Sequence, residues 1–330
     1  ISHKTTARQL GSILLLLRVS PMTLTMPMMI GMPSSQGLWI AAIAATVISV
    51  PLVAWMAALC RAEGLDDVIG ISRRLLGTID GSAVGWLFVL YWLILAAFEL
   101  RSVSEAYVTG VMTATPIMAF MVLTALVSAG IARRGIRLIA MMCELIALLI
   151  LVSVLLTMVM PLDMIQLRNL LPVLPEGLRP LASPTVTAVS LFLDMVVLMM
   201  IAPAMNSGRG LIRGTIWSVL VSGAMLASLL AAMNAVFGPL STALELPAFI
   251  LTQVISIGAA VERLEVITMA SWTFGVGLAL ATILWAAAVA SARLLNLTCY
   301  EPLVYPLGGL TVFLAIRMWP DVGNFDRSVT

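Results

Sequence analysis

The residues of this chain that could do chemistry are charged side chains inside long apolar segments. An ionisable group in such a segment is costly to bury, and it usually faces a cavity or an oppositely charged partner. Each of these positions is therefore a candidate for a binding site, an ion pair or a proton relay. Six residues make up the set: Arg18, Glu99, Arg101, Glu105, Glu144 and Asp194.

Spacing separates these charges into different roles. Glu105 follows Arg101 by one helical turn, so the two side chains can pair on one face of a helix. Glu99 lies about 160° around the same helix from Arg101, so we expect it to point elsewhere. Glu144 follows the arginines at 133–137 by about two turns and is a candidate partner for an arginine near that end. The alternative for Arg101, Glu105 and Glu144 is a proton or cation relay.

Enzyme chemistry has little support in this sequence. The chain has one histidine, His3, and three cysteines that form no CxxC pattern. No nucleophile–base pair can be placed, so we expect no catalytic residues, no metal site and no cofactor.

The composition is that of a membrane protein. Of the 330 residues, 61% are hydrophobic and 10% are charged, and the mean hydropathy is +1.10. A soluble domain has about 45–50% apolar and about 25% charged residues, so this chain has too few charges to cover a surface in water. Disordered proteins, coiled coils and nucleic-acid-binding modules are excluded on the same ground. We expect an all-α polytopic protein embedded in the lipid bilayer.

Nine apolar runs have the length of a membrane-spanning helix. The third and eighth runs are long enough to tilt or to protrude from the bilayer. The runs cover residues 9–31, 37–60, 83–111, 116–132, 135–160, 184–204, 211–237, 262–294 and 302–319.

The lysines and arginines of the connecting loops predict the orientation. Eleven fall on one side of the alternating topology and five on the other. Short cytoplasmic loops carry the excess of positive charge, so the N-terminus is predicted to be cytoplasmic.

Two of the predicted spans carry signals for an interrupted helix. The first contains Arg18, Ser20 and Pro21, and we expect it to unwind near residues 18–22 because proline removes a backbone donor. The sixth contains Ser190 and Asp194 and ends at Pro203. Breaks in spans 1 and 6 are typical of two inverted repeats of five helices, with a ligand site between the breaks. Two ordinary kinked helices would give the same pattern.

Several motifs, taken together, resemble a known family. Residues 131–144 read IARRGIRLIAMMCE, residues 169–180 read NLLPVLPEGLRP, and residues 255–265 read ISIGAAVERLE. With LRSVSE at 100–105, their order and spacing resemble the B subunit of spore germinant receptors, the GerAB family, over nearly the whole chain.

The resemblance implies a LeuT-like fold of the amino acid–polyamine–organocation superfamily, with broken helices 1 and 6. It also implies one transmembrane domain over 1–330, with a first repeat at about 9–160 and a second at about 184–330. The family has ten spans, so a tenth is expected beyond the nine seen here. Further implications are a place in the inner membrane of the spore, A and C partner subunits, and a small germinant, often an L-amino acid.

The germinant is then expected between spans 1, 3, 6 and 8. Ser20-Pro21 and the bulky stretch 190–194 stand where the family usually has glycine-containing breaks, which favours a small or apolar ligand. Two alternatives remain open, a proton-coupled amino acid transporter and a scaffold subunit with a vestigial pocket. The predicted ligand-binding residues are Leu17, Arg18, Ser20, Pro21, Thr23, Glu99, Ser190, Phe192, Leu193, Asp194, Ser271 and Gly275.

Overall fold

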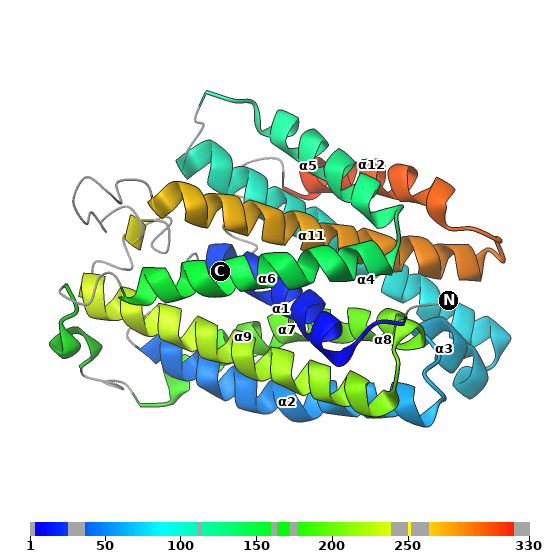
Figure 1. Ribbon diagram of the computed structural model, residues 1–330, viewed down its shortest axis with the longest axis horizontal. Helices are drawn as coiled ribbons and strands as arrows, with labels where there is room; N and C mark the ends of the chain where they lie inside the picture. The colour runs from blue at the N-terminus through cyan, green and yellow to red at the C-terminus, as the bar shows by residue number, and fades with distance from the viewer. Residues whose placement is uncertain are drawn as a thin grey trace.

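The fold consists of helices arranged along one long axis (Figure 1). The computed structural model describes residues 4–25, 37–110, 114–159, 164–171, 177–238, 250–251 and 264–319. Within these residues the only β feature is a single bridge between Thr5 and Met205.

Long helices form most of the molecule, and short ones interrupt the middle of the chain. The first half contains α1 (Ala7–Thr25), α2 (Leu38–Ala62), α3 (Val68–Leu76), α4 (Thr78–Gly110), α5 (Ile117–Ala132) and α6 (Ile136–Val159). The second half contains the 3₁₀ turns η4 (Leu167–Leu170) and η5 (Arg179–Leu181), then α7 (Ala182–Phe192), η6 (Leu193–Val197), α8 (Leu198–Ile201), η7 (Ala202–Ala204), α9 (Gly208–Phe237), α11 (Leu264–Leu294) and α12 (Glu301–Met318).

The helices coincide with the nine predicted spans. Six helical segments of the described chain are long and apolar enough to cross a membrane, and α5 is a shorter apolar helix. The two spans expected to be long are α4, with 33 residues, and α11, with 31. At 1.5 Å per residue each is roughly 45–50 Å long, which exceeds the roughly 30 Å of bilayer hydrocarbon.

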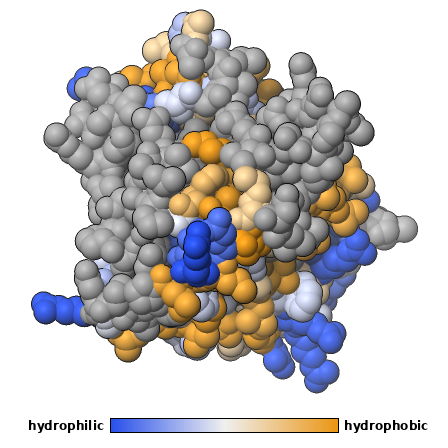
Figure 2. All heavy atoms as spheres, turned by 90° about the vertical axis from the view of Figure 1, so that its left-hand side faces the viewer, coloured by the Kyte–Doolittle hydropathy of each residue, from blue (hydrophilic) through white to orange (hydrophobic). Residues whose placement is uncertain are grey.

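The outer surface is apolar, as a lipid-facing surface must be. Large hydrophobic side chains such as Trp55, Leu87, Leu145 and Trp217 are exposed on the outside of their helices. Figure 2 looks onto the end of the bundle that lies at the left of Figure 1, where orange apolar side chains are visible between grey residues and a few blue groups. In lipid this exposure carries no penalty, and the chain is a multi-pass integral membrane protein.

Helix α1 lies inside the bundle. It packs against α4, α6, α9 and α11, and its side chains Leu10, Ile13, Leu14 and Leu16 are fully buried. Figure 1 shows α1 between α6 and α9. Arg18, which follows these residues on α1, is therefore enclosed by protein.

Two glycines allow helices to approach α9 closely. A Cβ atom at Gly214 would lie 2.6 Å from the backbone oxygen of Ala7 on α1. A Cβ at Gly223 would collide with Thr46 on α2. Small residues at such contacts let the backbones pack tightly in a membrane, where dispersion contacts replace the hydrophobic effect.

The expected unwinding of span 1 at residues 18–22 is wrong. Helix α1 continues through Arg18 and Pro21 to Thr25, and residues 26–36 lie outside the described residues. Pro21 removes one backbone donor, and a surrounding bundle can compensate for a loss of that size.

The interruption of span 6 is confirmed. After α7 the chain enters the 3₁₀ turn η6 at Leu193, passes through the single turn α8, and ends in η7 around Pro203. A 3₁₀ stretch inside a long helix is tighter and less well bonded than an α-helix and often marks a functional hinge. Asp194 lies in this stretch.

Candidate functional site

The centre of the candidate site is Asp194, held on the irregular stretch η6. Its carboxylate is 6% exposed, and one oxygen accepts a hydrogen bond of 2.7 Å from the hydroxyl of Tyr91 on α4. This bond links the interrupted sixth span to the third.

Arg18 lies beside this carboxylate and is 1% exposed. Its guanidinium carbon is 4.4 Å from the centroid of the Phe192 ring, a cation–π contact with the helix that leads into η6. Arg18 interacts electrostatically with Asp194, Tyr91 and Glu99. None of its three guanidinium nitrogens has a hydrogen-bond partner among the described residues.

Glu99 completes the cluster. It is 2% exposed, and its Oε2 atom has no hydrogen-bond partner within the part of the chain that the structure describes. Glu99 interacts electrostatically with both Arg18 and Asp194. One arginine thus interacts with two buried acids.

These four residues, with Tyr91, bring three helices together at one point. Arg18 comes from α1, Tyr91 and Glu99 from α4, and Phe192 and Asp194 from the sixth span. Buried polar groups are normally hydrogen-bonded, and an orphaned one calls for a specific explanation. Arg18 has donors and Glu99 has an acceptor with no partner among the described residues, which makes this cluster a candidate for binding a ligand that bears both charges.

Some of the predicted binding residues lie elsewhere. Leu193 is 37% exposed, whereas its neighbours Phe192 and Asp194 are buried. Ser190 is exposed, and its hydroxyl donates to the backbone oxygen of Thr187 at 2.7 Å. Neighbours in a helix turn by about 100°, so Phe192 and Asp194 can face inward while Leu193 faces out.

Some of the remaining predicted positions are buried in the core, and the others have side chains that lie outside the described residues. Leu17 is buried next to Arg18. Ser271 is buried in α11, donates to the backbone of Thr268, and lies 3.2 Å from the Ser153 hydroxyl of α6. Gly275 is buried one turn further along α11. The side chains of Ser20, Pro21 and Thr23 lie outside the described residues.

The predicted ion pair on the third span is confirmed. Arg101 and Glu105 are joined at 2.8 Å and are both buried. Glu99 points away from this pair, as its position on the helix predicts. Glu144 belongs to another location: it pairs with the exposed Arg8 at 2.8 Å, as its place near the arginine-rich end suggests.

Tyr91 was missed by the sequence reasoning. It is one of four tyrosines in the chain, and it lies two turns before Glu99 in an apolar span. A tyrosine hydroxyl buried in an apolar setting usually finds a hydrogen-bond partner, and this rule could have flagged Tyr91.

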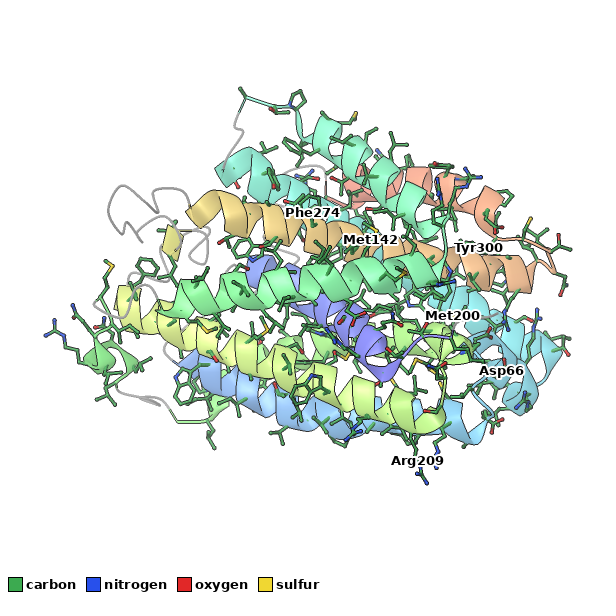
Figure 3. The ribbon with its side chains drawn as sticks, in the orientation of Figure 1. Asp66, Met142, Met200, Arg209, Phe274 and Tyr300 are labelled. Carbon is green, nitrogen blue, oxygen red and sulfur yellow. The ribbon has the colours of Figure 1, made fainter. Side chains whose placement is uncertain are left out.

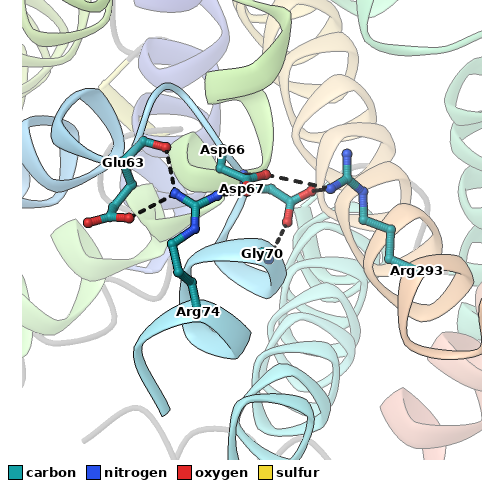
Figure 4. Close-up of polar contacts among 6 residues, drawn as sticks. All are labelled: Glu63, Asp66, Asp67, Gly70, Arg74 and Arg293. Atoms are coloured by element: carbon teal, nitrogen blue, oxygen red, sulfur yellow. Dashed lines mark hydrogen bonds and ion pairs between the residues drawn. The ribbon is translucent and has the colours of Figure 1, made fainter. Parts of the chain in front are cut away.

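A second cluster of charges joins the α2–α3 connection to the end of α11 (Figure 4). Arg293 pairs with Asp67 and lies 3.8 Å from Asp66, while Arg74 pairs with Asp66 and Glu63, each at 2.9 Å. The Asp67 carboxylate also accepts from the Gly70 amide at 2.9 Å and so caps α3.

The Asp67 carboxyl titrates under opposing influences. Burial raises its pKa above the ordinary value, while the Gly70 amide and the Arg293 guanidinium oppose the rise. The N-terminal segment is bound to the end of span 6, because the Thr5 amide donates to the backbone oxygen of Ala204 and the Asn206 amide donates to the backbone oxygen of Thr5. These contacts tie together helix ends, away from the Arg18 cluster.

Comparisons with known proteins agree with this architecture. A family model described as "Spore germination protein" matches residues 4–324. Spore germination protein KB of Bacillus subtilis (strain 168) is 26% identical over 261 residues, which cover 78% of this chain and 68% of that protein. A substrate-bound, outward-open structure of a Na⁺-coupled sialic acid symporter is 12% identical, with a TM-score of 0.74, covering 96% of this chain and 75% of that one. The likeness to the symporter shows the fold alone, which is the LeuT-like fold expected from the sequence.

Proposed function

The chain belongs to the spore germination protein family, and from this premise we propose that it is the germinant-binding membrane subunit of a spore germinant receptor. The proposal includes the inner membrane of the spore, a cytoplasmic N-terminus, and signalling to A and C subunits. The orientation is supported by the excess of lysine and arginine in one set of loops.

The observation that carries the proposal is the pair of unused polar groups in the buried cluster. Within the described residues, the guanidinium donors of Arg18 and one carboxylate oxygen of Glu99 have no hydrogen-bond partner. An amino acid carries a carboxylate and an ammonium on adjacent groups, and these match the two charges. Charge-assisted hydrogen bonds of this kind are about twice as strong as neutral ones.

In this proposal each residue has one role. Arg18 binds the germinant carboxylate and Glu99 binds its ammonium. Asp194, held by Tyr91, keeps Arg18 in place and ties the ligand to the interrupted sixth span. Phe192 packs against the flat face of the guanidinium and leaves its edges free.

In this proposal the signal is a change of conformation at η6, the 3₁₀ stretch of span 6. A ligand that binds one arrangement of α1, α4 and η6 better than another shifts the population toward that arrangement. The 3₁₀ stretch is the weakest part of span 6, so it is the place where such a shift would occur.

The test is ligand-induced thermal stabilisation of the purified protein. Each L-amino acid is compared with its amide, which lacks the carboxylate, and with its deaminated acid, which lacks the ammonium. Binding to the folded state adds RT ln(1 + [L]/Kd), about 2.7 kcal/mol at 100 times Kd, and raises the melting temperature. We expect one or two small amino acids to stabilise the protein and both analogues to fail.

Matched variants separate the site from general effects on folding. Arg18→Gln should weaken binding of the amino acid until it binds no more tightly than its amide. Glu99→Gln should weaken binding of the amino acid until it binds no more tightly than its deaminated acid. Leu193→Trp places a large side chain on the outward side of η6 and should leave binding intact. Equal thermal stabilisation by the amino acid and by its two analogues would contradict a site that binds both the carboxylate and the ammonium.

A proton-coupled amino acid transporter is the second candidate, favoured by the transporter-like fold. Uptake of labelled amino acid into vesicles, driven by a proton gradient, would support transport. Binding without uptake would favour the receptor over the transporter. A normal germination response after Arg18→Gln would favour a scaffold subunit.

A further inference from the structure

A groove on the membrane-facing side of the bundle lies between α1, α6 and α9. It has a volume of about 450 Å³, and a second hollow of about 610 Å³ adjoins it, sharing Arg8, Glu144 and Leu148. Figure 1 looks toward this region, with α1 between α6 and α9. The groove is distinct from the Arg18 cluster, none of whose residues line it.

One end of the groove is strongly basic. Four cations, Lys4, Arg8, Arg137 and Arg213, line the two hollows together with one carboxylate, Glu144, which leaves a net charge of +3. Lys4 precedes α1, and the three arginines lie in the N-terminal parts of α1, α6 and α9, which therefore start at the same end of the molecule. Glu144 is already paired with Arg8 at 2.8 Å, so Arg213 and Arg137 remain to bind an anion.

The rest of the groove is apolar. Leu15, Leu148, Leu151 and Val221 line it, with Trp217 at its edge, 65% exposed toward the lipid. Gly11 and Gly214 form the floor of the groove. Because they have no side chains, α1 and α9 lie in contact there and nothing projects into the groove from these two positions.

One buried polar atom in this wall is unused. Ser218 is 1% exposed and lines the groove, and its hydroxyl has no hydrogen-bond partner among the described residues. It follows Arg213 by five residues, or about 7.5 Å along the helix. The groove thus presents, in order, cations, a hydroxyl and an apolar wall.

We propose that this groove binds one anionic phospholipid. The headgroup phosphate accepts from Arg213 and Arg137, the Ser218 hydroxyl donates to an ester carbonyl, and an acyl chain lies against Leu151 and Val221. Clusters of basic residues at the end of membrane helices typically bind anionic headgroups, and each cation near the surface contributes about a fivefold gain in affinity. The order of groups in the groove is the order of groups in a phospholipid.

This proposal is independent of the germinant site. The lipid would contact α1 at Arg8, Gly11 and Leu15, on the same helix as Arg18. A bound lipid would therefore hold α1 against α6 and α9, and anionic membranes would stabilise the protein more than neutral ones.

The experiment uses the full chain purified in detergent and titrated with dioleoyl phosphatidylglycerol or dioleoyl phosphatidylcholine, with bound lipid counted by native mass spectrometry. We expect phosphatidylglycerol to bind at least fivefold more tightly. Arg213→Gln should reduce that affinity about fivefold, the effect of one basic contact. Arg209→Gln is the matched control, because Arg209 lies one turn earlier on α9, outside the groove lining, and points away from the molecule (Figure 3).

A second pair of variants tests occupancy of the apolar part. Leu148→Trp should fill the groove and lower phosphatidylglycerol binding, whereas Val152→Trp, one turn along α6 and outside the lining, should not. Equal binding of the two lipids, or equal loss in the two arginine variants, would overturn the proposal. Displacement of the lipid by millimolar inorganic phosphate would also overturn it. The same holds if the protein forms a dimer without added lipid and Leu148→Trp abolishes that dimer.

Discussion

Two arginine–carboxylate clusters in this protein are built from the same residue types and differ in how completely they are paired. Arg293 pairs with Asp67 and lies close to Asp66, at the end of α11. Arg18 lies at the centre of the bundle, near Asp194 and Glu99, with no hydrogen bond to any described group.

The difference separates a structural contact from a candidate binding site. An arginine that forms an ion pair at a helix end while partly exposed to solvent, as Arg293 does, fastens two elements without a further ligand. An arginine that is buried with its donors unused costs free energy unless another group completes it, because desolvation is not repaid. The geometry therefore favours the Arg18 cluster as a ligand site and the Arg293 cluster as a fastening between α11 and the α2–α3 connection.

The largest expected effect is the loss of germinant binding in Arg18→Gln. Truncating one partner of a buried charge pair costs about 2–5 kcal/mol, so affinity should fall at least about thirtyfold. Titration calorimetry with the stabilising amino acid measures the change. Arg293→Gln provides the comparison, and an equal loss of affinity there would contradict the division of roles.

Tyr91→Phe should have the next largest effect. It removes the 2.7 Å hydrogen bond to Asp194 and leaves the ring in place. A hydrogen bond to a charged group contributes about 1.5–3 kcal/mol, so germinant affinity should fall roughly tenfold or more if Asp194 holds Arg18 in position. Unchanged affinity, measured in the same way, would show that the Tyr91–Asp194 bond does not organise the site.

Asp67→Ala should lower stability and leave binding unchanged. The variant loses the cap on α3, which contributes about 1 kcal/mol, and the pairing with Arg293. Asp67→Asn keeps a capping oxygen and loses only the charge, so its melting temperature should lie between those of wild type and Asp67→Ala. A thermal unfolding series in one detergent checks this order, and identical values for the two variants would exclude a role for the cap.

The smallest expected effect is a dependence of stability on pH. The folded-state pKa of Asp67 is raised above its unfolded value, so the folded protein binds more protons between the two values. Stability from this group is present below the ordinary carboxyl pKa and falls as pH rises through the folded pKa. Arg293→Gln removes the cation that opposes the shift and should move this fall to higher pH, and Asp67→Asn should abolish it in melting curves recorded between about pH 4 and 7.

Much of the fold could be predicted because hydrophobic length is a property of the chain itself. The nine predicted spans match helices such as α2, α4 and α11, since a bilayer requires a continuous apolar helix of fixed length. The Arg101–Glu105 pair was predicted for a similar reason, because one helical turn brings the two side chains together.

The location of the helix breaks was only half predictable. Span 6 departs from α-helix near Asp194, as expected, but α1 continues through Pro21. Whether a proline breaks a helix depends on what the neighbours offer to the carbonyl four residues earlier, which loses its backbone donor, and those neighbours come from distant parts of the chain.

The sequence by itself determined a polytopic helical membrane protein, its spans, and the charges that must be explained inside them, because these depend on composition and on spacing along one helix. Only the tertiary structure decided which charges meet. Glu144 pairs with Arg8 across two helices, Arg18 lies over Phe192 beside Asp194, and Leu193 faces outward. Contacts between helices depend on packing and rotation that no local spacing encodes. For that reason the central arginine, which has no hydrogen-bond partner among the described residues, could be recognised only in the folded protein.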